Sequence, residues 1–423
     1  MADLLTPLAL PSAGDTPPFI PADWVAAVEI ETTYRTDVSK SAYTLTEERR
    51  AWSLRPFRGV RVRLTGMDQA QSYRVFLNAL RRARARIPIP IYCDQSETTA
   101  SSSGTTINCD TTTRRFFDGG RVVIYKPLGA GVDGSSGADL IEWPVVDSHT
   151  GSALTLKAGL TNTYPAGCIV MPVMDAEVSL GGGLDLVTNR LARMTVSAEE
   201  ILGASALPQE ESGLPTGFPT LNGYPILNVG PDWGGGVSLS FIREGETFRA
   251  GRTEHTYLQG ADDNAPPRTS YRLRFLNLSR AEASSLRRFF DSRVGMLKGF
   301  YATFPQDILT ISAVGASGVT VLSRNPLDMT VFSTLAITLA DGTQYVYPVL
   351  SIAGPAPADT WAVTFTTTIA SFTPDQVATV CPAHFVRMAK DSLKESWTTD
   401  GISVIEFEVI EIIDELAAVI PNA

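Results

Sequence analysis

The stretch Val60-Arg-Val-Arg-Leu64 occurs a second time, in similar form, as Tyr271-Arg-Leu-Arg-Phe275. In both, apolar and basic residues alternate, which is the period-two pattern of a strand with one buried face and one polar face. Arg61 and Arg272 stand 211 positions apart in a chain of 423 residues. A strand that returns near half the chain length indicates that one structural unit is present twice.

Further matches lie on both sides of this strand and keep the same order. Upstream, Trp24 and Trp233 each follow a short Pro/Asp sequence and precede an alternating strand pattern. Downstream, Met171-Pro172 matches Cys381-Pro382. All the offsets lie between 204 and 211 positions, so we predict a tandem duplication, with Trp24, Trp233, Pro172 and Pro382 as repeat anchors. Two further matches are Trp143–Asp147 with Tyr347–Ser351 and Met194–Ile201 with Ile405–Ile412.

These anchors define the expected domains. A Pro/Gly-rich polar segment, Pro208–Pro219, separates the two copies and is typical of a connector. We expect an N-terminal arm over residues 1–16, a first β-rich repeat over 17–205, a linker over 206–223, a second β-rich repeat over 224–415 and a C-terminal tail over 416–423.

Each copy continues from its Arg-x-Arg strand into a helical pattern. Apolar residues spaced by three and four would form one buried stripe, and Ser279 with Glu282 is a capping-box signature for the start of the second helix. We therefore expect a mainly β, α+β fold: a duplicated β-sandwich or barrel domain with one packed helix. The Ser/Thr run Ser96–Thr113 and the Gly/Ser-rich Gly129–Gly137 read as loops. The stripe residues are Met67, Ala70, Tyr73, Phe76, Leu77 and Leu80 in the first copy and Leu278, Ala281, Leu286, Phe289 and Phe290 in the second.

Composition excludes several classes of protein. A formal net charge of −10 argues against a protein that wraps nucleic-acid phosphates. No apolar run reaches the length of a membrane helix, so we expect a soluble protein with no membrane segment, made in a reducing cytoplasm. Four scattered cysteines lack metal-site spacing; Cys93 and Cys109 could pair across the Ser/Thr run or remain separate buried thiols.

No pattern of catalytic residues emerges. His149, His255 and His384 are far apart, and no nucleophile, zinc-protease or phosphate-loop motif occurs. Glu406 and Glu408 share one face of the last strand, where they are more naturally a channel-facing surface or a solvated edge than the opposed pair that glycoside hydrolysis needs. We expect no enzyme, no cofactor and no metal.

A basic group stands out in this acidic chain and has three interpretations. It suits docking against an acidic neighbouring subunit, contact with nucleic acid, or an ordinary solvated helix face. A milder group in the second copy, comprising Arg287, Arg288, Arg293 and Lys298, favours the subunit contact. The candidate subunit-contact residues are Arg61, Arg63, Arg81, Arg82, Arg84 and Arg86, with Arg58 nearby.

Taken together, these motifs resemble a known group of proteins. A Pro/Asp/Trp opening leads to an Arg-x-Arg strand and a helix, then to an apolar segment that ends in an aromatic residue with Asp or Pro, at Ile91–Asp94 and Phe300–Pro305. This order is similar to the distal tail and baseplate proteins of tailed bacteriophages and of gene-transfer particles. The resemblance implies a β-sandwich or barrel with a packed helix, related to tail-tube subunits that form a ring around the DNA channel.

The resemblance also implies partners. They would be further copies of the chain, the tail-tube protein and the baseplate hub or fibre proteins, with DNA only in transit past an acidic channel wall. The protein would belong to the tail tip of the virion and be made in the bacterial cytoplasm. Six chains per ring are favoured, since threefold hubs usually carry additional domains; three chains giving a pseudo-sixfold hub are the alternative. A receptor- or carbohydrate-binding module, using the loops at 94–117 and 129–138, is the other alternative.

Overall fold

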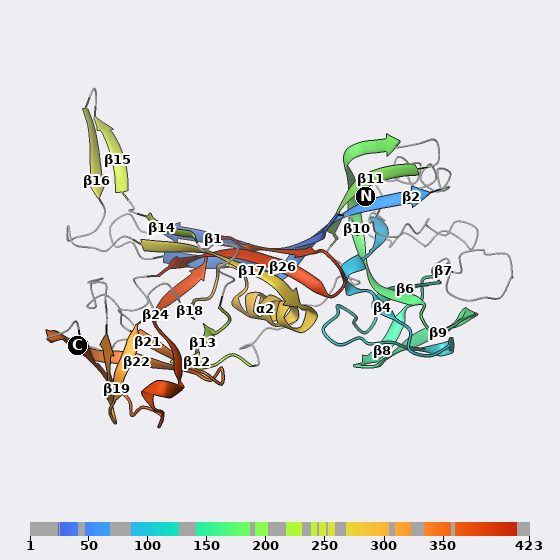
Figure 1. Cartoon of the computed structure of the whole chain (residues 1–423). Coiled ribbons are helices and arrows are strands. Elements are labelled where there is room, and N and C mark those ends of the chain that lie inside the picture. The colour runs from blue at the N-terminus through green and yellow to red at the C-terminus, as the bar shows by residue number, and fades with distance from the viewer. Residues whose placement is uncertain are drawn as a thin grey trace.

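The computed structural model shows an elongated molecule in which strands predominate (Figure 1). The structure describes residues 24, 26–40, 47–67, 86–126, 141–186, 191–201, 217–230, 238–242, 245–250, 253–258, 268–303, 309–322, 334–356 and 360–412. Within these residues the fold is mainly β, with large antiparallel sheets and one α-helix, α2 (Arg280–Arg293). No helix of the described part is long and apolar enough to cross a membrane.

Five strands of the first half form an antiparallel ladder that the second half repeats. The first ladder has the order β1-β2-β11-β10-β3, and the second has the order β14-β17-β26-β24-β18. The first set spans β1 (Val28–Lys40), β2 (Glu47–Met67), β11 (Leu191–Glu200), β10 (Ile169–Leu186) and β3 (Arg86–Pro90). The second spans β14 (Ser238–Ile242), β17 (Arg268–Ser279), β26 (Ile402–Glu411), β24 (Val377–Met388) and β18 (Phe300–Thr303).

The two ladders also share their register. Arg61 lies opposite Ser197 in the first ladder, and Arg272 lies opposite Glu408 in the second, with both partners shifted by 211 positions. On the other side of the strand, Arg61 faces Glu29 and Arg272 faces Ser238, and these two partners are 209 positions apart. A slip of one residue would turn every side chain to the other face of a strand, so equal register means that equivalent residues bury equivalent faces.

Each ladder carries a smaller β subdomain with its own core, inserted before the strand that contains the anchor proline. The first core includes Ile107, Leu154 and Val170, and the second includes Val321, Ile337 and Val363. The first subdomain comprises β4 (Ser96–Glu97), β5 (Ser102–Asn108), β6 (Arg121–Tyr125), β7 (Ile141–Glu142), β8 (Val146–Thr150) and β9 (Ala153–Tyr164), after the short helix η1 (Tyr92–Asp94). The second comprises β19 (Thr310–Val314), β20 (Gly318–Leu322), β21 (Thr334–Leu339), β22 (Gln344–Ala356), β23 (Thr360–Phe365) and η4 (Pro374–Gln376).

The Ser/Thr run at Ser96–Thr113 corrects one expectation. It contains the strands β4 and β5 rather than a simple loop, and β5 pairs with β9. Ile107 is fully buried while most of β5 faces solvent, and β-branched threonines suit such a half-exposed strand. The Gly/Ser-rich segment expected at Gly129–Gly137 lies outside the described residues.

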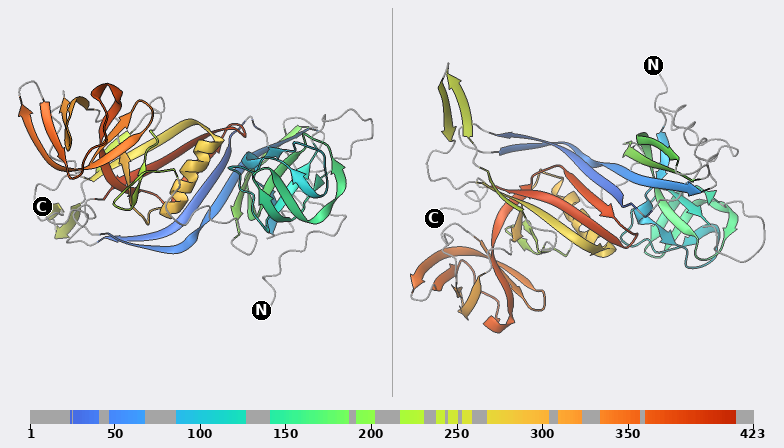
Figure 2. Two further views of the ribbon diagram at one scale, coloured as in Figure 1. Left: turned by 90° about the horizontal axis from the view of Figure 1, so that it is seen from below. Right: turned by 45° about the horizontal axis from the view of Figure 1, so that its top comes forward.

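The two copies are joined into one sheet. Residues 28–33 of β1 pair antiparallel with β25 (Ser392–Trp397), which in turn pairs with β26. The main core accordingly takes side chains from both halves, among them Val28 and Val60 from the first and Phe289 and Ile405 from the second. The long β1–β2 ribbon therefore crosses from its own ladder onto the other one (Figure 2).

The predicted linker is shorter than expected. Thr220–Leu221 forms β12, which turns at Asn222-Gly223 into β13 (Tyr224–Leu227), and β13 pairs in parallel with β18. Both Asn222 and Gly223 have a positive φ, which asparagine and glycine tolerate best. The end of the predicted linker is therefore part of the second fold, and residues 202–216 lie outside the described part.

Helix α2 begins as the sequence predicts. The Ser279 hydroxyl accepts a hydrogen bond from the Glu282 backbone N–H, and the Glu282 carboxylate accepts one from the Ser279 N–H at 2.8 Å, which completes the capping box. Leu286, Phe289 and Phe290 are buried against the sheet. The helix expected in the first copy, with most of its stripe residues, falls in 68–85, outside the described residues.

A two-stranded arm projects from the second ladder. β15 (Gly245–Ala250) and β16 (Thr253–Leu258) pair only with each other among the described strands. They extend away from the sheet beyond β14 (Figures 1 and 2). This arm takes the place, in the second copy, of the distal half of the β1–β2 ribbon.

Candidate functional site

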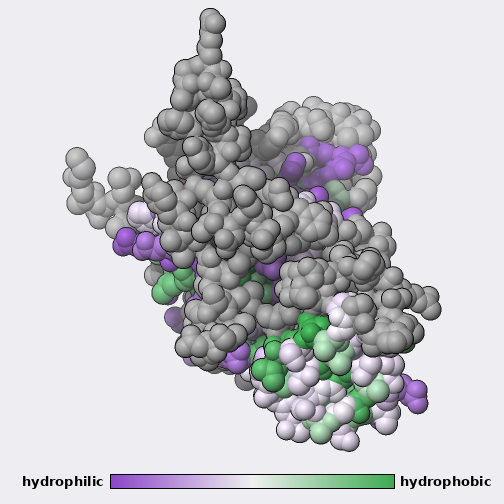
Figure 3. All heavy atoms as spheres, turned by 90° about the vertical axis from the view of Figure 1, so that its left-hand side faces the viewer, coloured by the Kyte–Doolittle hydropathy of each residue, from purple (hydrophilic) through white to green (hydrophobic). Residues whose placement is uncertain are grey.

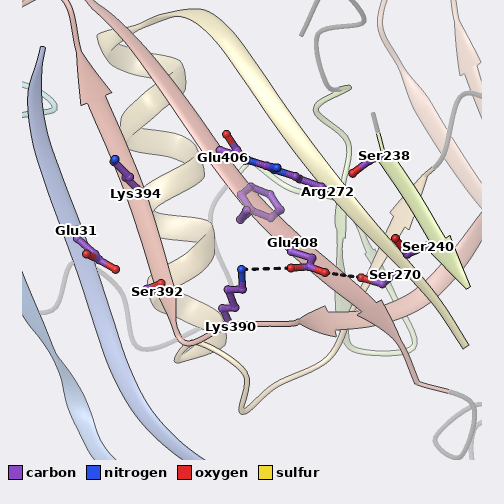
Figure 4. Close-up of a pocket in the computed structure, with 11 residues that line it drawn as sticks. Glu31, Ser238, Ser240, Ser270, Arg272, Lys390, Ser392, Lys394, Glu406 and Glu408 are labelled. Atoms are coloured by element: carbon purple, nitrogen blue, oxygen red, sulfur yellow. Dashed lines mark hydrogen bonds and ion pairs between the residues drawn. The ribbon is translucent and has the colours of Figure 1, made fainter. Parts of the chain in front are cut away.

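The joined sheet has one polar face, which is formed by the side chains that point away from the core on each alternating strand. On β26, Ile405, Phe407 and Val409 are buried in the core with α2, whereas Glu406 and Glu408 lie on the opposite face. A groove of about 580 Å³ lies on this face (Figure 4). Its lining comes from both copies: Glu31, Ser238, Ser240, Ser270, Arg272, Lys390, Ser392, Lys394, Glu406, Phe407 and Glu408.

Charges on this face alternate in sign from strand to strand. Arg272 of β17 pairs with Glu406 of β26. Further along the sheet, Lys394 Nζ of β25 lies 2.9 Å from Glu29 Oε1 of β1, and Glu29 Oε2 lies 4.0 Å from Arg61 Nη1 of β2. Glu406 and Glu29 therefore each face a cation on a neighbouring strand, and the groove lining itself has three acidic and three basic side chains.

Glu408 is held by two partners. Lys390 Nζ lies 3.5 Å from Glu408 Oε2, and the Ser270 hydroxyl donates a hydrogen bond of 2.8 Å to Glu408 Oε1. These partly exposed pairs orient the face, and each contributes at most about 1 kcal/mol to stability. Because β26 is paired with β17 on one side and β25 on the other, Glu406 and Glu408 do not lie at a sheet edge, which corrects that half of the expectation.

Three of the sequence-predicted basic residues lie on two described strands of the first ladder. Arg61 is exposed on the polar face and Arg63 is half-buried beside it on β2. Arg86 begins β3, and Arg81, Arg82 and Arg84 lie outside the described residues.

The repeat anchors serve the core. Trp24 packs against the main core, and Trp233 is outside the described part. Pro172 and Pro382 are buried at equivalent ladder positions, opposite Val122 and Leu335.

The basic group predicted in the second copy is partly internal. Arg287 and Arg293 have 1% and 3% of their surface exposed, and Arg293 Nη1 donates a hydrogen bond to the Gly299 carbonyl. Neither side chain can dock an outside partner, so the second copy lends less support to a basic subunit contact than the sequence suggested.

Sequence reasoning missed an ionic cluster at the junction of the two copies, formed by Asp94, Arg115, Arg280, Arg287 and Glu395. Arg115 bridges the two carboxylates, at 3.0 Å to Asp94 Oδ2 and 2.6 Å to Glu395 Oε1. Both carboxylates are fully buried. Asp94 and Arg115 come from the first copy and the other three residues from the second, so the cluster fixes the two copies to each other.

The second copy completes the cluster from two elements. Arg280 Nη1 of α2 lies 3.1 Å from Asp94 Oδ1, and Arg287 Nη1 lies 3.4 Å from Glu395 Oε2. Trp397 Nε1 donates a hydrogen bond of 3.2 Å to the same Glu395 oxygen, and the Arg280 guanidinium lies 4.9 Å from the Trp397 ring centroid. The arginine fork can satisfy several acceptors at once, which a buried carboxylate requires.

The cluster sets the ionisation of its buried groups. Burial alone would raise the pKa of the Asp94 carboxyl, but the combined attraction of Arg115, Arg287 and Arg280 holds it below its usual value. Burial, reinforced by the Asp94 charge, raises the pKa of the neighbouring Cys93 thiol well above its usual value. Cys93 is therefore an inert internal thiol rather than a nucleophile.

The Asp94 shift predicts an acid-dependent loss of stability. Because its folded pKa lies below the unfolded value of 3.8, the ionised carboxyl stabilises the fold fully above that pH. The contribution is lost as the pH falls through the lower folded pKa. We expect the difference in free energy of unfolding between the wild type and Asp94→Asn to shrink when urea titrations move from about pH 6 to about pH 3. Asp118→Asn, a surface change, is the control; an unchanged difference for Asp94→Asn would contradict the assignment.

The structure also describes the cysteines and His384, which the sequence presents as candidate site residues. All four cysteines are free and buried, so Cys93 and Cys109 are not paired. His384 Nδ1 lies 3.2 Å from Glu411 Oε1 inside the second ladder. The described residues contain no group of three or more His, Cys, Asp or Glu side chains placed to hold a metal ion.

Two parts of the described surface are apolar or poor in charge. Trp52 and Leu54 of β2 are 72% and 64% exposed, unusual for large apolar side chains. The second subdomain, residues 309–322, 334–356 and 360–376 of the described chain, carries only Asp341 and Asp375 as charged residues. Its surface is correspondingly pale to green in the lower part of Figure 3. Depletion of charge is typical of interface cores.

The fold and the polar face define a mainly β protein built from a duplicated five-strand ladder, with charges balanced along one sheet face. No protein-family model and no curated protein matches the sequence.

Proposed function

We propose that this chain is a structural component of a phage tail tip, in which several copies form a ring at the distal end of the tail tube. The observation that carries the proposal is the pairing of β1 with β25, which sets the two copies side by side in one continuous sheet. Equivalent units joined laterally are the repeating element that a closed ring needs.

The lateral arrangement changes the favoured number of chains. Six chains would suit two stacked rings, one for each copy, but copies that share a sheet belong to the same layer. The geometry therefore supports the alternative, in which three chains supply six units and make a pseudo-sixfold hub. The number six comes from the resemblance to tail-tube subunits.

The polar face is the side that we place toward the channel. Helix α2 and both subdomains lie on the other side of the sheet, and no helix or subdomain of the described residues covers this face (Figure 1). Its carboxylates, including Glu406 and Glu408, are matched by cations such as Arg272 and Lys394. A charge-balanced wall holds DNA phosphates weakly and permits passage. Trp52, Leu54 and the weakly charged second subdomain then offer surfaces for tail-tube and baseplate neighbours.

The alternative of a carbohydrate-binding module finds less support. Sugar sites usually present exposed aromatic rings, and between residues 94 and 117 the aromatic residues Phe116 and Phe117 are buried and half-buried. The segment 129–138 lies outside the described residues.

Native mass spectrometry and electron microscopy of the purified full chain test the proposal. We expect rings with three times the chain mass of 45.5 kDa. Antibodies against the chain should label the tail end of virions. A chain that stays monomeric at about 50 μM, a concentration at which weak protein contacts saturate, and that is absent from virions would overturn the proposed function. Rings of six chains would restore the stacked arrangement.

A further inference from the structure

The contact between the two copies within one chain supplies a template for the contact between chains. In the template, β1 lies antiparallel to β25, from Val28 opposite Trp397 to Thr33 opposite Ser392. The first copy thus supplies what we call the donor strand, the first part of β1. The second copy supplies the acceptor strand, β25, which precedes its last ladder strand, β26.

The second copy has its own version of the donor strand, and its outer side is open. β14 is the equivalent of β1, because Ser238 faces Arg272 as Glu29 faces Arg61. β14 pairs with β17 on one side, and no strand of the described chain pairs with its other side. Ser238 and Ser240 are exposed there.

The first copy has its own version of the acceptor strand, and this side is open too. The end of β10 is the equivalent of β25, because Leu184 faces Met194 as Glu395 faces Ile405, with both partners shifted by 211. On its other side β10 pairs with β3 only as far as Glu177. Beyond Glu177, no described strand lies against that edge of β10.

We propose that β14 of one chain pairs antiparallel with residues 181–186 of β10 in the next copy of the same chain. The template fixes the register: Glu29 opposite Ser396 becomes Ser238 opposite Asp185 of the neighbouring chain. This inference rests on the proposed ring, since it names the surfaces by which the ring closes. The interface is head-to-tail, so each chain offers one donor edge and one acceptor edge, and closure leaves neither exposed.

Local features of both edges suit this contact. The acceptor segment begins with Gly181-Gly-Gly183, and glycine in a strand allows another backbone to approach closely. On the donor side, the β15–β16 arm follows β14 as the distal part of the β1–β2 ribbon, residues 36–40 with 47–51, follows the part of β1 that pairs with β25. Within the chain that ribbon reaches past β25, where the Thr36 N–H donates to Asp391 Oδ2 at 2.5 Å and Arg49 Nη1 donates to the Leu297 carbonyl at 3.1 Å. The arm would extend over the neighbouring chain in the same way.

Cysteine cross-linking in the full-length chain tests the register. We expect Ser238→Cys with Asp185→Cys to form disulfides between chains on mild oxidation, giving covalent dimers and closed rings on non-reducing gels. The four native cysteines are buried and give little background. Glu29→Cys with Ser396→Cys, the template pair, should form a disulfide within one chain. Ser240→Cys with Asp185→Cys, two positions out of register, should cross-link at least tenfold less.

The outcomes separate the interface from the ring. If native mass spectrometry shows rings but the Ser238–Asp185 pair cross-links no better than the shifted pair, the inferred interface is wrong and the proposed function stands. If the pair cross-links into open chains without closing, the interface is right and the ring is wrong. Deleting the arm Gly245–Leu258 gives an independent readout. We expect the ring of this variant to dissociate at a protein concentration about tenfold higher than that at which the wild-type ring dissociates. An unchanged concentration would exclude a contribution from the arm.

Discussion

Replacing Glu395 with glutamine is expected to lower the free energy of unfolding by about 3–5 kcal/mol, because it removes the buried carboxylate that pairs with Arg115 and Arg287 and leaves Asp94 as the remaining acidic partner of Arg115. The carboxylate is fully buried and accepts from Arg115 at 2.6 Å and from Arg287 at 3.4 Å. Glutamine keeps the volume but removes the charge, and its amide N–H₂ would face a cation or the Trp397 N–H. Urea unfolding followed by circular dichroism measures the loss.

Glu406→Gln is the matched control. Glu406 is also paired with an arginine, Arg272, but on the solvent face of the neighbouring strand, so its loss should cost less than about 1 kcal/mol. The comparison isolates burial, since both changes remove one carboxylate charge and keep its shape. Equal effects of the two substitutions would show that the cluster is not the strong contact that its burial implies.

The alternating strands within each ladder could be predicted from the sequence because their signals are local, whereas the order of the five strands could not. The alternation at Val60–Leu64 and Tyr271–Phe275 specifies which face of each strand is buried, and the offset of 211 between Arg61 and Arg272 recurs in the ladder register. The start of α2 could also be predicted, since Ser279 and Glu282 are three residues apart and each side chain accepts a hydrogen bond from the other residue's backbone N–H.

The pairing of the two copies could not be predicted, because the sequence of an edge strand does not indicate which strand pairs with it. Nothing in Val28–Thr33 indicates that β25, more than 350 residues away, pairs with it. The ionic cluster is hidden for the same reason: Asp94, Arg115 and Glu395 belong to no periodic pattern, and their charges meet only through tertiary packing. In the sequence Arg287 looked like a surface residue because charge alone does not reveal burial.

Phe290→Ala is expected to cost about 3–5 kcal/mol and to loosen both copies together, because the cavity opens in a core that they share. Phe290 is fully buried on α2, and its ring centroid lies 5.7 Å from that of Tyr34 on β1 of the other copy. The Tyr34 hydroxyl also donates a hydrogen bond of 2.8 Å to Asp291. Urea unfolding gives the total loss, and hydrogen–deuterium exchange shows where protection falls.

The control for this prediction is Phe365→Ala, which opens a comparable cavity in the separate core of the second subdomain. Its cost should be similar, but exchange should quicken in β20, β22 and β23 while β1 stays protected. Phe290→Ala should instead quicken exchange in β1 and β25 as well as in β17 and β26. The phenyl side chain packs in the core beneath the strands on both sides of the junction, so its removal weakens the packing of all four. If β1 kept its protection in Phe290→Ala, the two copies would be stable independently of each other. The pairing of β1 with β25 would then be too weak to serve as the template for a ring.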